Sequence, residues 1–406
     1  MVIKYDMPNH WIKYDPLGIV KELTEAKAAV LSLTSIPFQR SWADALQEIE
    51  LKREVAGTSK IEGADFTEKE FEEAVTGKTA ESSLTRSQKQ ARAAINTYRW
   101  LAQIRRDVSI SEDLIHDIHC RIVTGCDDDH CAPGVLRGQD QNVIFGRPPH
   151  RGAAGGAECM SAFKRLCEAL NQEFRAHDGL VQALSVHYHL GAIHPYQDGN
   201  GRTARALEAL LLKKVDLKDT LFISMSNYYY DEKDAYLATL SQVSSAGHDL
   251  TSFLKFGLTG IATQSHRLLR EIRAHVSRSL YRDMMGQMYG RLLSTRKRAL
   301  AKRQLSILEK LLDRDSPTNV EDLQKELSNE YGPLKATNKA FIRDMNNLLH
   351  LRAVDINKAP HPLPGRTFLS QYSAWVRLEW PMEITETQFY EEMKKMPRAK
   401  TRLMPW

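Results

Sequence analysis

The stretch HPYQDGNGRTAR, from His194 to Arg205, carries the most chemical information of any part of this 406-residue chain. An apolar run ends at Ile193, and the alanine- and leucine-rich sequence from Ala204 onward has a helical period. The polar stretch is therefore predicted to be a loop that opens a helix. Two glycines on either side of an asparagine permit a tight turn. Backbone N–H groups at a helix N-terminus attract anions.

The polar side chains of this stretch suit phosphate chemistry. Arg202 and Arg205 lie three positions apart, so they share one helix face and can bind neighbouring phosphates. Asp198 offers the oxygen ligand that Mg²⁺ takes while it bridges phosphates. His194 titrates near neutral pH and is suited to act as a general base. Together these residues predict nucleotide-dependent phosphoryl or nucleotidyl transfer.

The stretch resembles the signature loop of the Fic family, His-Pro-[Phe/Tyr]-x-[Asp/Glu]-Gly-Asn-Gly-Arg-x-x-Arg, and matches every defined position. The resemblance implies a mainly α-helical protein, a Fic-type helical bundle with a small β-hairpin flap. It also implies an enzyme that transfers AMP from Mg·ATP to a Ser, Thr or Tyr hydroxyl of a target protein. His194 would be its catalytic base, and Asp198 would hold Mg²⁺. The implied nucleotide-binding residues are Asp198, Gly199, Asn200, Gly201, Arg202 and Arg205.

A second motif, TSKIEG, lies upstream at residues 58–63. It resembles the inhibitory pattern [Ser/Thr]-x-x-x-Glu-[Gly/Asn] of Fic proteins whose inhibitory helix precedes the catalytic loop. Thr58 and Glu62 lie four positions apart and so share one helix face. A carboxylate at this helix end can pair with Arg205 and hold ATP in a non-productive pose. The alternative is an ordinary surface glutamate before a helix-ending Gly63.

Two further stretches resemble parts of the Fic family's binding sites. Residues 134–146 are bounded by glycines and contain β-branched residues, so we expect a hairpin. It resembles the flap that pairs with an extended target segment; the docking residues would be Gln141, Asn142, Val143 and Ile144. A tyrosine-rich stretch downstream resembles the wall of the adenine pocket, although aromatic residues at helical spacing are also typical of a core. The pocket residues would be Tyr228, Tyr229 and Tyr236.

Periodicity predicts helices at 15–33, 38–55, 67–76, 87–107, 112–124, 157–174 and 181–193. Net charge then changes along the chain: residues 1–260 contain 30 Lys and Arg against 35 Asp and Glu, and residues 261–406 contain 26 against 16. Beyond residue 304 the predicted order of three helices and a β-hairpin is typical of a winged helix-turn-helix. The expected domains are an N-terminal helical region (1–110), a Fic core (111–260), a basic helical linker (261–303) and a winged-helix-like domain (304–406).

The C-terminal part could bind either another protein or DNA, and the sequence does not decide between them. Residues 301–350 contain 8 basic and 8 acidic residues, which favours protein contact. Residues 261–300, with 9 basic against 2 acidic residues, are the better nucleic-acid candidate. A homodimer is also open. The alternative functions are a DNA-binding regulator that uses the Fic part as a nucleotide sensor, and an enzyme that also removes AMP.

Composition indicates a globular protein, with 42% hydrophobic and 26% charged residues. Five cysteines, an odd number, favour reduced thiols and a cytoplasmic location. The sequence shows no signal peptide and no apolar run of the roughly 20 residues that span a bilayer, so no membrane partner is expected. The expected ligands and partners are ATP, Mg²⁺ and a target protein that presents an extended Ser, Thr or Tyr segment, and auto-AMPylation is expected as well.

Overall fold

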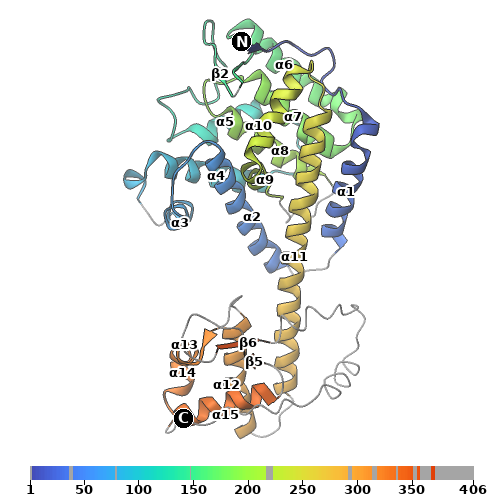
Figure 1. Ribbon diagram of the computed structural model, residues 1–406. Helices are drawn as coiled ribbons and strands as arrows, with labels where there is room; N and C mark the ends of the chain where they lie inside the picture. The colour runs from blue at the N-terminus through green and yellow to red at the C-terminus, as the bar shows by residue number, and fades with distance from the viewer. Residues whose placement is uncertain are drawn as a thin grey trace. The chain divides into compact units, whose positions relative to one another are not determined.

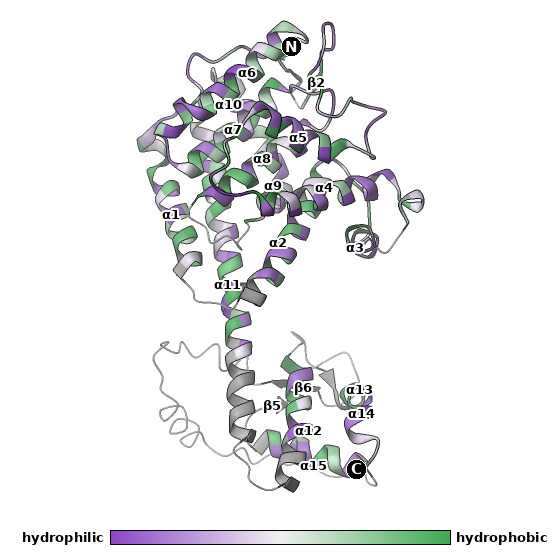
Figure 2. Ribbon diagram, turned by 180° about the vertical axis from the view of Figure 1, so that it is seen from behind, coloured by the Kyte–Doolittle hydropathy of each residue, from purple (hydrophilic) through white to green (hydrophobic). Residues whose placement is uncertain are grey.

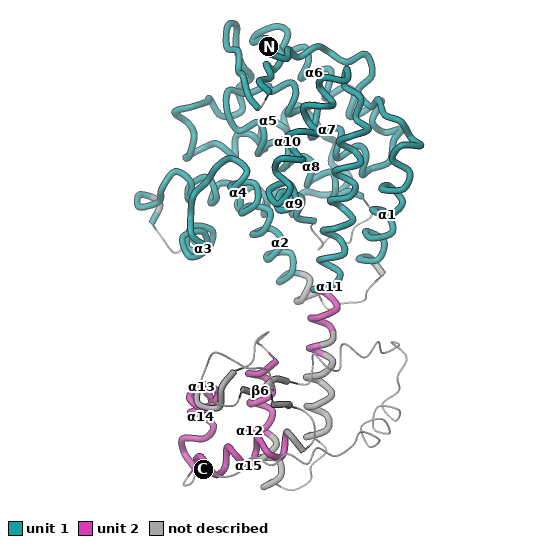
Figure 3. Tube along the Cα trace, viewed as in Figure 1, with its two compact units in different colours: residues 1–271 teal, residues 272–406 magenta. Residues whose placement is uncertain are grey.

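The computed structural model describes residues 2–35, 40–77, 80–146, 148–215, 223–290, 295–312, 318–334, 337–350, 354–356 and 367–370. The chain forms two compact units, residues 1–271 and 272–406 (Figure 3). Helices dominate both, so the predicted fold class is confirmed. The division between the units falls inside one helix, which also runs through the boundary expected at residue 260. The other expected boundaries stay predictions.

The first unit is a bundle of helices with a small sheet at one end (Figure 1). The predicted helices are all present, with their ends shifted by a few residues. Its elements are β1 (Ile3–Lys4), α1 (Pro16–Ser35), α2 (Arg40–Ile61), α3 (Glu68–Thr76), η1 (Glu81–Ser83), α4 (Arg86–Gln103), α5 (Glu112–Val123), β2 (Ile144–Phe145), β3 (His150–Arg151), α6 (Ala157–Asn171), η2 (Glu173–Ala176), α7 (Gly179–Ile193), α8 (Asn200–Lys214), α9 (Met225–Asp231), α10 (Lys233–Ser245) and α11 (Thr251–Gly290), of which α11 continues into the second unit.

The core of this unit is built around α7 and α8. α7 is apolar on nearly all sides, and Leu180, Leu184 and Leu190 have almost no exposed surface. A helix without a polar face is stable only when other helices enclose it. Hydrophilic residues gather instead on the outer loops and on α3 (Figure 2). α8 packs along α7, so the polar loop between them is held at both ends by buried helices.

α2 packs closely against α9. A Cβ atom on Gly57 would lie 2.6 Å from the backbone nitrogen of Asn227, so a larger residue there would force the backbone of α2 or α9 to shift. One turn earlier, the buried carboxylate of Glu54 accepts hydrogen bonds from the Ser226 N–H (2.8 Å) and the Tyr98 hydroxyl (3.1 Å). Desolvation raises the pKa of Glu54 to about 7, against the opposing effect of its hydrogen bonds to Ser226. These contacts fix the C-terminal part of α2.

The small sheet corrects the predicted flap. β2 pairs antiparallel with β3, and β1 pairs parallel with β3, giving the strand order β1-β3-β2. The hairpin expected over residues 134–146 is therefore wrong in its bounds: its first strand begins only at Ile144. Residues 134–143 form turns and irregular backbone instead.

The reason for this difference is Arg137, whose side chain is completely buried. Its guanidinium donates hydrogen bonds to the carbonyl oxygens of Gln141 (2.5 Å), Ala153 (2.5 Å) and His194 (2.7 Å). A buried guanidinium needs such acceptors. The segment wraps around Arg137 rather than pairing as a strand, and it ties the flap to the polar loop.

The second unit has a hydrophobic core of its own, which includes Leu308, Leu323, Tyr331 and Phe341. The three predicted helices and the predicted hairpin strands occur in the expected order, and the strand β4 and the helix α14 are additions that the sequence did not predict. The assignment as a winged helix and its partner stay predictions. Its three short strands form an antiparallel sheet in the order β4-β6-β5. After the end of α11 these elements are α12 (Thr295–Leu312), β4 (Thr318–Asn319), α13 (Val320–Glu326), α14 (Ser328–Tyr331), α15 (Thr337–His350), β5 (Val354–Ile356) and β6 (Thr367–Ser370).

An acidic residue on α15, Asp344, is completely buried. It accepts hydrogen bonds from Arg303 (2.9 Å) and from the Tyr331 hydroxyl (3.0 Å). Its charge is therefore neutralised within the unit and is not presented on the surface of α15. Among the helices that the structure describes, none has the length and apolarity needed to cross a membrane.

Candidate active site

His194 ends α7 in a left-handed backbone conformation, with φ 54° and ψ 59°. Its Nδ1 lies 3.1 Å from the carbonyl oxygen of Gly191. Because a carbonyl oxygen only accepts, Nδ1 carries the proton of the neutral ring and Nε2 keeps a free lone pair. The ring also stacks on Phe145, with 3.9 Å between centroids. Desolvation lowers the pKa of His194 to about 4, although the bond to Gly191 opposes it, so the ring is neutral at pH 7.

The loop after His194 is closed by one of its own side chains. Asn200 accepts a hydrogen bond from the Tyr196 N–H (2.9 Å) and donates one to the Tyr196 carbonyl oxygen (2.8 Å). The buried Tyr196 ring stacks on His119, with 3.6 Å between centroids. His119 donates from Nε2 to the carbonyl oxygen of Asp198 (3.0 Å). The backbone of the loop is thus fixed before any ligand binds.

The two glycines of the loop have different surroundings. Gly199 has φ 75°, and a Cβ there would lie 2.7 Å from Val123 Cγ1. A Cβ on Gly201 would lie 2.6 Å from Oε1 of Glu62. α8 begins at Asn200, so the N–H groups of its first turn have no partners within the helix. They form a site suited to an anion at the start of α8.

Arg205 brings the two sequence motifs together. Its buried guanidinium forms an ion pair with Glu62 and donates from Nε to the Thr58 hydroxyl (2.8 Å). Gly63 follows with φ 86° and ends the helical backbone of α2. Desolvation is the largest influence on the pKa of Glu62 and raises it, but the charge and hydrogen bond of Arg205, together with the charge of Arg202, shift it downward overall. Burial likewise acts to lower the pKa of Arg205, and the charge and hydrogen bond of Glu62, together with smaller contributions from nearby tyrosines, raise it overall.

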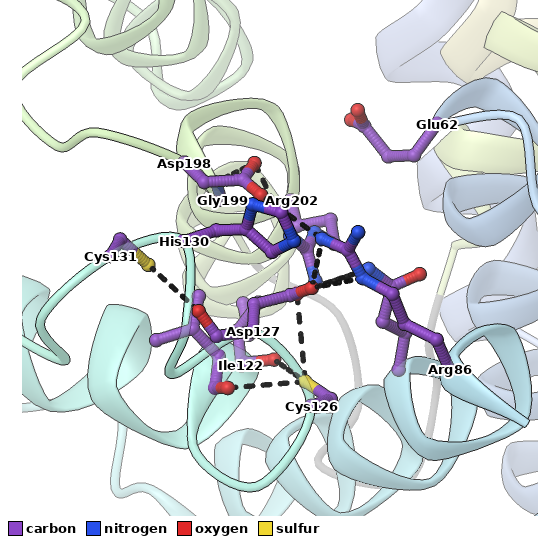
Figure 4. Close-up of polar contacts among 12 residues, drawn as sticks. Glu62, Arg86, Ile122, Cys126, Asp127, His130, Cys131, Asp198, Gly199 and Arg202 are labelled. Atoms are coloured by element: carbon purple, nitrogen blue, oxygen red, sulfur yellow. Dashed lines mark hydrogen bonds and ion pairs between the residues drawn. The ribbon is translucent and has the colours of Figure 1, made fainter.

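Arg202 is held by a residue that the sequence analysis did not single out. Its Nη1 donates to Asp127 (2.6 Å), which also accepts from Arg86 and from Gln90 (Figure 4). Asp127 is completely buried. Desolvation is the largest influence on its pKa and raises it, but the charge of Arg202 and the hydrogen bonds from Arg202, Arg86 and Gln90 together lower it overall. Asp198 lies beside the same cluster, where its side chain is 40% exposed.

A cavity of about 330 Å³ runs along the loop. Its lining comes from the loop and the start of α8, from the end of α2, from α10, and from α7, β2 and β3. Lys233 on α10 donates to the carbonyl oxygen of Ile61 (2.8 Å), which holds these two elements together. The cavity wall includes Glu62, His194, Asp198, Gly199, Asn200, Gly201, Arg205, Lys233 and Tyr236.

The three tyrosines expected at the adenine pocket have different places. Tyr236 lines the cavity. Tyr229 is completely buried and donates to the carboxylate of Glu208 (2.8 Å), so it lies in the core rather than at the cavity wall. Tyr228 packs against Phe256, with 5.0 Å between ring centroids. Tyr229 is therefore better described as a core residue than as part of the expected adenine pocket.

Tyr236 is held by a buried chain of polar groups. Its hydroxyl lies 2.8 Å from Nε2 of His187, whose Nδ1 contacts Glu208. Burial raises the pKa of Tyr236 to about 12, although Arg205 lowers it in part. This arrangement keeps a neutral hydroxyl at the cavity wall, next to the guanidinium of Arg205.

The predicted docking residues lie in and before β2, at the outer edge of the small sheet. Ile144 is 61% exposed. The three residues before it contribute acceptors to the surrounding loops: Gln141 Oε1 accepts from Gly138, Asn142 Oδ1 from Gly155, and the Val143 carbonyl oxygen from Gly152.

Several site residues have no local signature in the sequence. Asp127 and Arg86 belong to the site only through contacts with distant positions. His119 supports the loop from α5 in the same way. Periodicity and motif spacing act over a few residues, so they could not identify them. The residues found by the structure alone are Arg86, His119, Asp127, Arg137, His187 and Glu208.

Comparison with known proteins agrees with this geometry. Residues 109–212 match the Fic/DOC family. The matched segment spans α5 to α8 and therefore contains the loop and both of its arginines. Residues 58–63 lie outside it.

Solved structures are similar over more of the chain. A Fic family protein from Desulfovibrio desulfuricans aligns with a TM-score of 0.57 at 17% identity, covering 90% of this chain and 98% of that one. A fragment of Fic-1 from C. elegans aligns with a TM-score of 0.50 at 19% identity, covering 63% of this chain and 73% of that one. At these identities the likeness shows a shared fold.

Proposed function

We propose that this Fic/DOC-domain protein is an adenylyltransferase that moves AMP from Mg·ATP to a Ser, Thr or Tyr hydroxyl of a protein. One observation carries the proposal: a neutral imidazole, a carboxylate, the open N-terminus of α8 and a buried guanidinium line one cavity. The residues are His194, Asp198 and Arg205, with the backbone of Gly199 to Gly201. A nucleotide sensor would need the phosphate site but not a base beside it, so the intact His194 favours the enzyme.

In the proposed reaction, Nε2 of His194 takes the proton from the target hydroxyl. The hydroxyl oxygen forms a bond to the α-phosphorus of ATP. The bond from this phosphorus to the bridging oxygen breaks, and diphosphate leaves with the electron pair. The first-turn N–H groups of α8 stabilise the charge on the α-phosphate oxygens. Arg202 and Arg205 bind the distal phosphates.

Asp198 is the residue that would hold Mg²⁺. Within the described residues there is no group of three or more His, Cys, Asp or Glu side chains that could form a complete metal cage. A single, partly exposed carboxylate suits an ion that takes its other ligands from phosphates and water. When bound, the ion neutralises phosphate charge. The residues present therefore fit Mg²⁺ delivered with a nucleotide.

We further propose that the protein inhibits itself through Glu62. Its pairing with Arg205 occupies the guanidinium that would bind the γ-phosphate, so ATP would enter in a non-productive pose. The exposed strand β2 is the edge on which an extended target segment would pair. A related alternative is that Glu62 positions a water for the removal of AMP. A cytoplasmic location stays an expectation.

The test is incubation of the purified protein with labelled ATP and Mg²⁺, alone and with cell extract as a source of targets. His194→Ala should lower AMP transfer by about 10²- to 10⁴-fold, because the general base is lost. Binding of ATP to this variant should persist. His10→Ala, at an exposed position that is not part of the cavity lining, is the matched control. Equal transfer by His194→Ala and the wild type would overturn the assignment. Binding without any transfer would support the sensor.

A further inference from the structure

The carboxylate of Asp198 lies close to two guanidinium groups. Nη2 of Arg202 is 3.5 Å from Oδ1, and Nη2 of Arg86 is 3.7 Å from Oδ2. Arg202 belongs to the loop motif, but Arg86 comes from the first turn of α4 (Figure 4). These distances exceed those of ordinary hydrogen bonds and are in the range of ion pairs. The candidate metal ligand is therefore already engaged by cations.

Asp127 holds both guanidinium groups in place. Its Oδ2 accepts from Arg202, and its Oδ1 accepts from Nε (2.9 Å) and Nη2 (2.6 Å) of Arg86. Gln90 adds a neutral hydrogen bond to the same carboxylate (2.8 Å). A buried carboxylate with this many donors has little freedom to move. Arg86, although 49% exposed, is thus fixed at the side of Asp198.

The charges of this cluster determine what it can bind. Asp127, Asp198, Arg86 and Arg202 sum to zero net charge. A divalent cation that arrives alone at Asp198 meets the two positive groups that contact its ligand. A nucleotide brings several negative charges, which those groups attract. Nε of Arg202 is also buried and has no hydrogen-bond partner within the described part of the chain. The cluster therefore favours a phosphate–metal complex over a free metal ion.

We propose that Arg86 is a positioning residue that, anchored by Asp127, keeps Asp198 paired until a nucleotide arrives, so that the divalent cation is taken up with the phosphates and not alone. The inference rests on the proposed function, because that proposal assigns the metal to Asp198. It adds a residue from α4, outside the matched family segment, and it sets the order in which the ligands bind.

The test compares the binding of two probes, Mn²⁺ without nucleotide and ATP without metal, by calorimetric titration of the full chain. Arg86→Gln should bind Mn²⁺ about tenfold more tightly than the wild type, since a positive charge 3.7 Å from the carboxylate ligand is removed. The same variant should bind metal-free ATP several-fold more weakly. Arg86→Lys should resemble the wild type in both titrations. If Arg86 had only a structural role, Arg86→Gln would bind both Mn²⁺ and ATP more weakly.

Two controls complete the experiment. Gln90→Ala removes a hydrogen bond from the same carboxylate without changing any charge, so it should give no gain in Mn²⁺ affinity over the wild type. Adding Asp198→Asn to Arg86→Gln should abolish the gain in Mn²⁺ binding. The proposal is overturned if Arg86→Gln binds Mn²⁺ no more tightly than Gln90→Ala, or if the gain persists without Asp198. If the affinities for Mn²⁺ and ATP change as expected but the protein transfers no AMP, the proposed function is overturned and the role of Arg86 is not.

Discussion

Glu62 and Arg205 form an ion pair across 143 positions of the sequence, and this pair places a carboxylate at the first turn of α8. The carboxylate lies so close to Gly201 that a Cβ there would approach Oε1 to 2.6 Å. One turn earlier on α2, Thr58 accepts a hydrogen bond from the same guanidinium. A helix terminus suited to phosphate is thus occupied by a negative group of the protein itself.

Replacing Glu62 should therefore raise activity. Glu62→Gly removes one charge-assisted pair, worth about 1.5–3 kcal/mol, and frees Arg205 for the γ-phosphate. Because Glu62 is 37% exposed, solvent weakens the pair, and we expect roughly tenfold more AMP incorporation, near the lower end of that range. Mass spectrometry of the purified variant after incubation with Mg·ATP measures this as an AMP adduct on Ser, Thr or Tyr.

Two controls accompany this variant. Asp65→Gly removes an acidic side chain from the loop that follows and should leave incorporation unchanged. Combining Glu62→Gly with Arg205→Ala should erase the gain, because the freed guanidinium is what binds the γ-phosphate. If Glu62→Gly carried no more adduct than Asp65→Gly at several ATP concentrations, self-inhibition would be the wrong account of the pair.

The packing of α2 on α9 offers a second route to activation. Gly57→Ala puts a methyl group 2.6 Å from the Asn227 nitrogen, and such overpacking costs about 1–3 kcal/mol. Since Thr58 and Glu62 follow on the same helix, the shift should also loosen their hold on Arg205. We expect a lower free energy of unfolding in urea together with higher AMP incorporation.

Gly191→Ala is the matched variant for stability. A Cβ at Gly191, in the helical part of α7, has nothing within 4 Å. Alanine there should be neutral or stabilise the protein by up to about 1 kcal/mol, because it is the better helix former. Equal unfolding free energies for the two alanine variants would mean that the close approach at Gly57 has no energetic consequence.

The pH dependence of the reaction should reflect the lowered pKa of His194. With a pKa of about 4 the imidazole is already neutral throughout the range above pH 5. The kcat/KM of Glu62→Gly should therefore not fall as the pH is lowered from about 7.5 to about 5.5. If the base were an unperturbed imidazole, with a pKa near 6.5, its neutral fraction and hence kcat/KM would fall about tenfold over this range. A fall in kcat/KM centred near pH 6.5 would show either that another group is the titrating base or that the ring of His194 is exposed to water.

His119 should make the folded protein sensitive to acid. Burial lowers its pKa to about 4, although the hydrogen bond to Asp198 opposes this. The unfolded chain takes up a proton near pH 6.5, but the folded protein does not until about pH 4. The stability contributed by the neutral ring is therefore complete above pH 6.5 and is lost as the pH falls toward 4.

Urea unfolding at pH 7 and at pH 5 measures this effect. His119→Gln should be less stable than the wild type at pH 7, because it loses the stack on Tyr196. The free energy of unfolding of this variant should also fall less than that of the wild type between pH 7 and pH 5. The difference is up to about 1.4 kcal/mol per pH unit. Identical losses for both proteins would mean that His119 does not contribute to the acid response.

The sequence determined the elements whose causes are local. Helix starts depend on caps within one turn: α3 begins after Thr67, and α4 begins at Arg86 because Thr85 and Gln88 form a capping box. The polar loop and the helix that follows it were likewise predicted from spacing. Such interactions act over three or four residues, so a sequence displays them directly.

Tertiary structure decided the rest, because burial and ion pairing join residues that are far apart in the chain. Asp127 meets Arg86 across 41 positions and Arg202 across 75, and no periodicity links them. Buried Arg137 draws carbonyl oxygens around itself and so moves the predicted hairpin. Tyr229 lies in the core, where the carboxylate of Glu208 accepts a hydrogen bond from its hydroxyl. A charge or hydroxyl removed from water must find a partner, and only the folded chain determines which one is within reach.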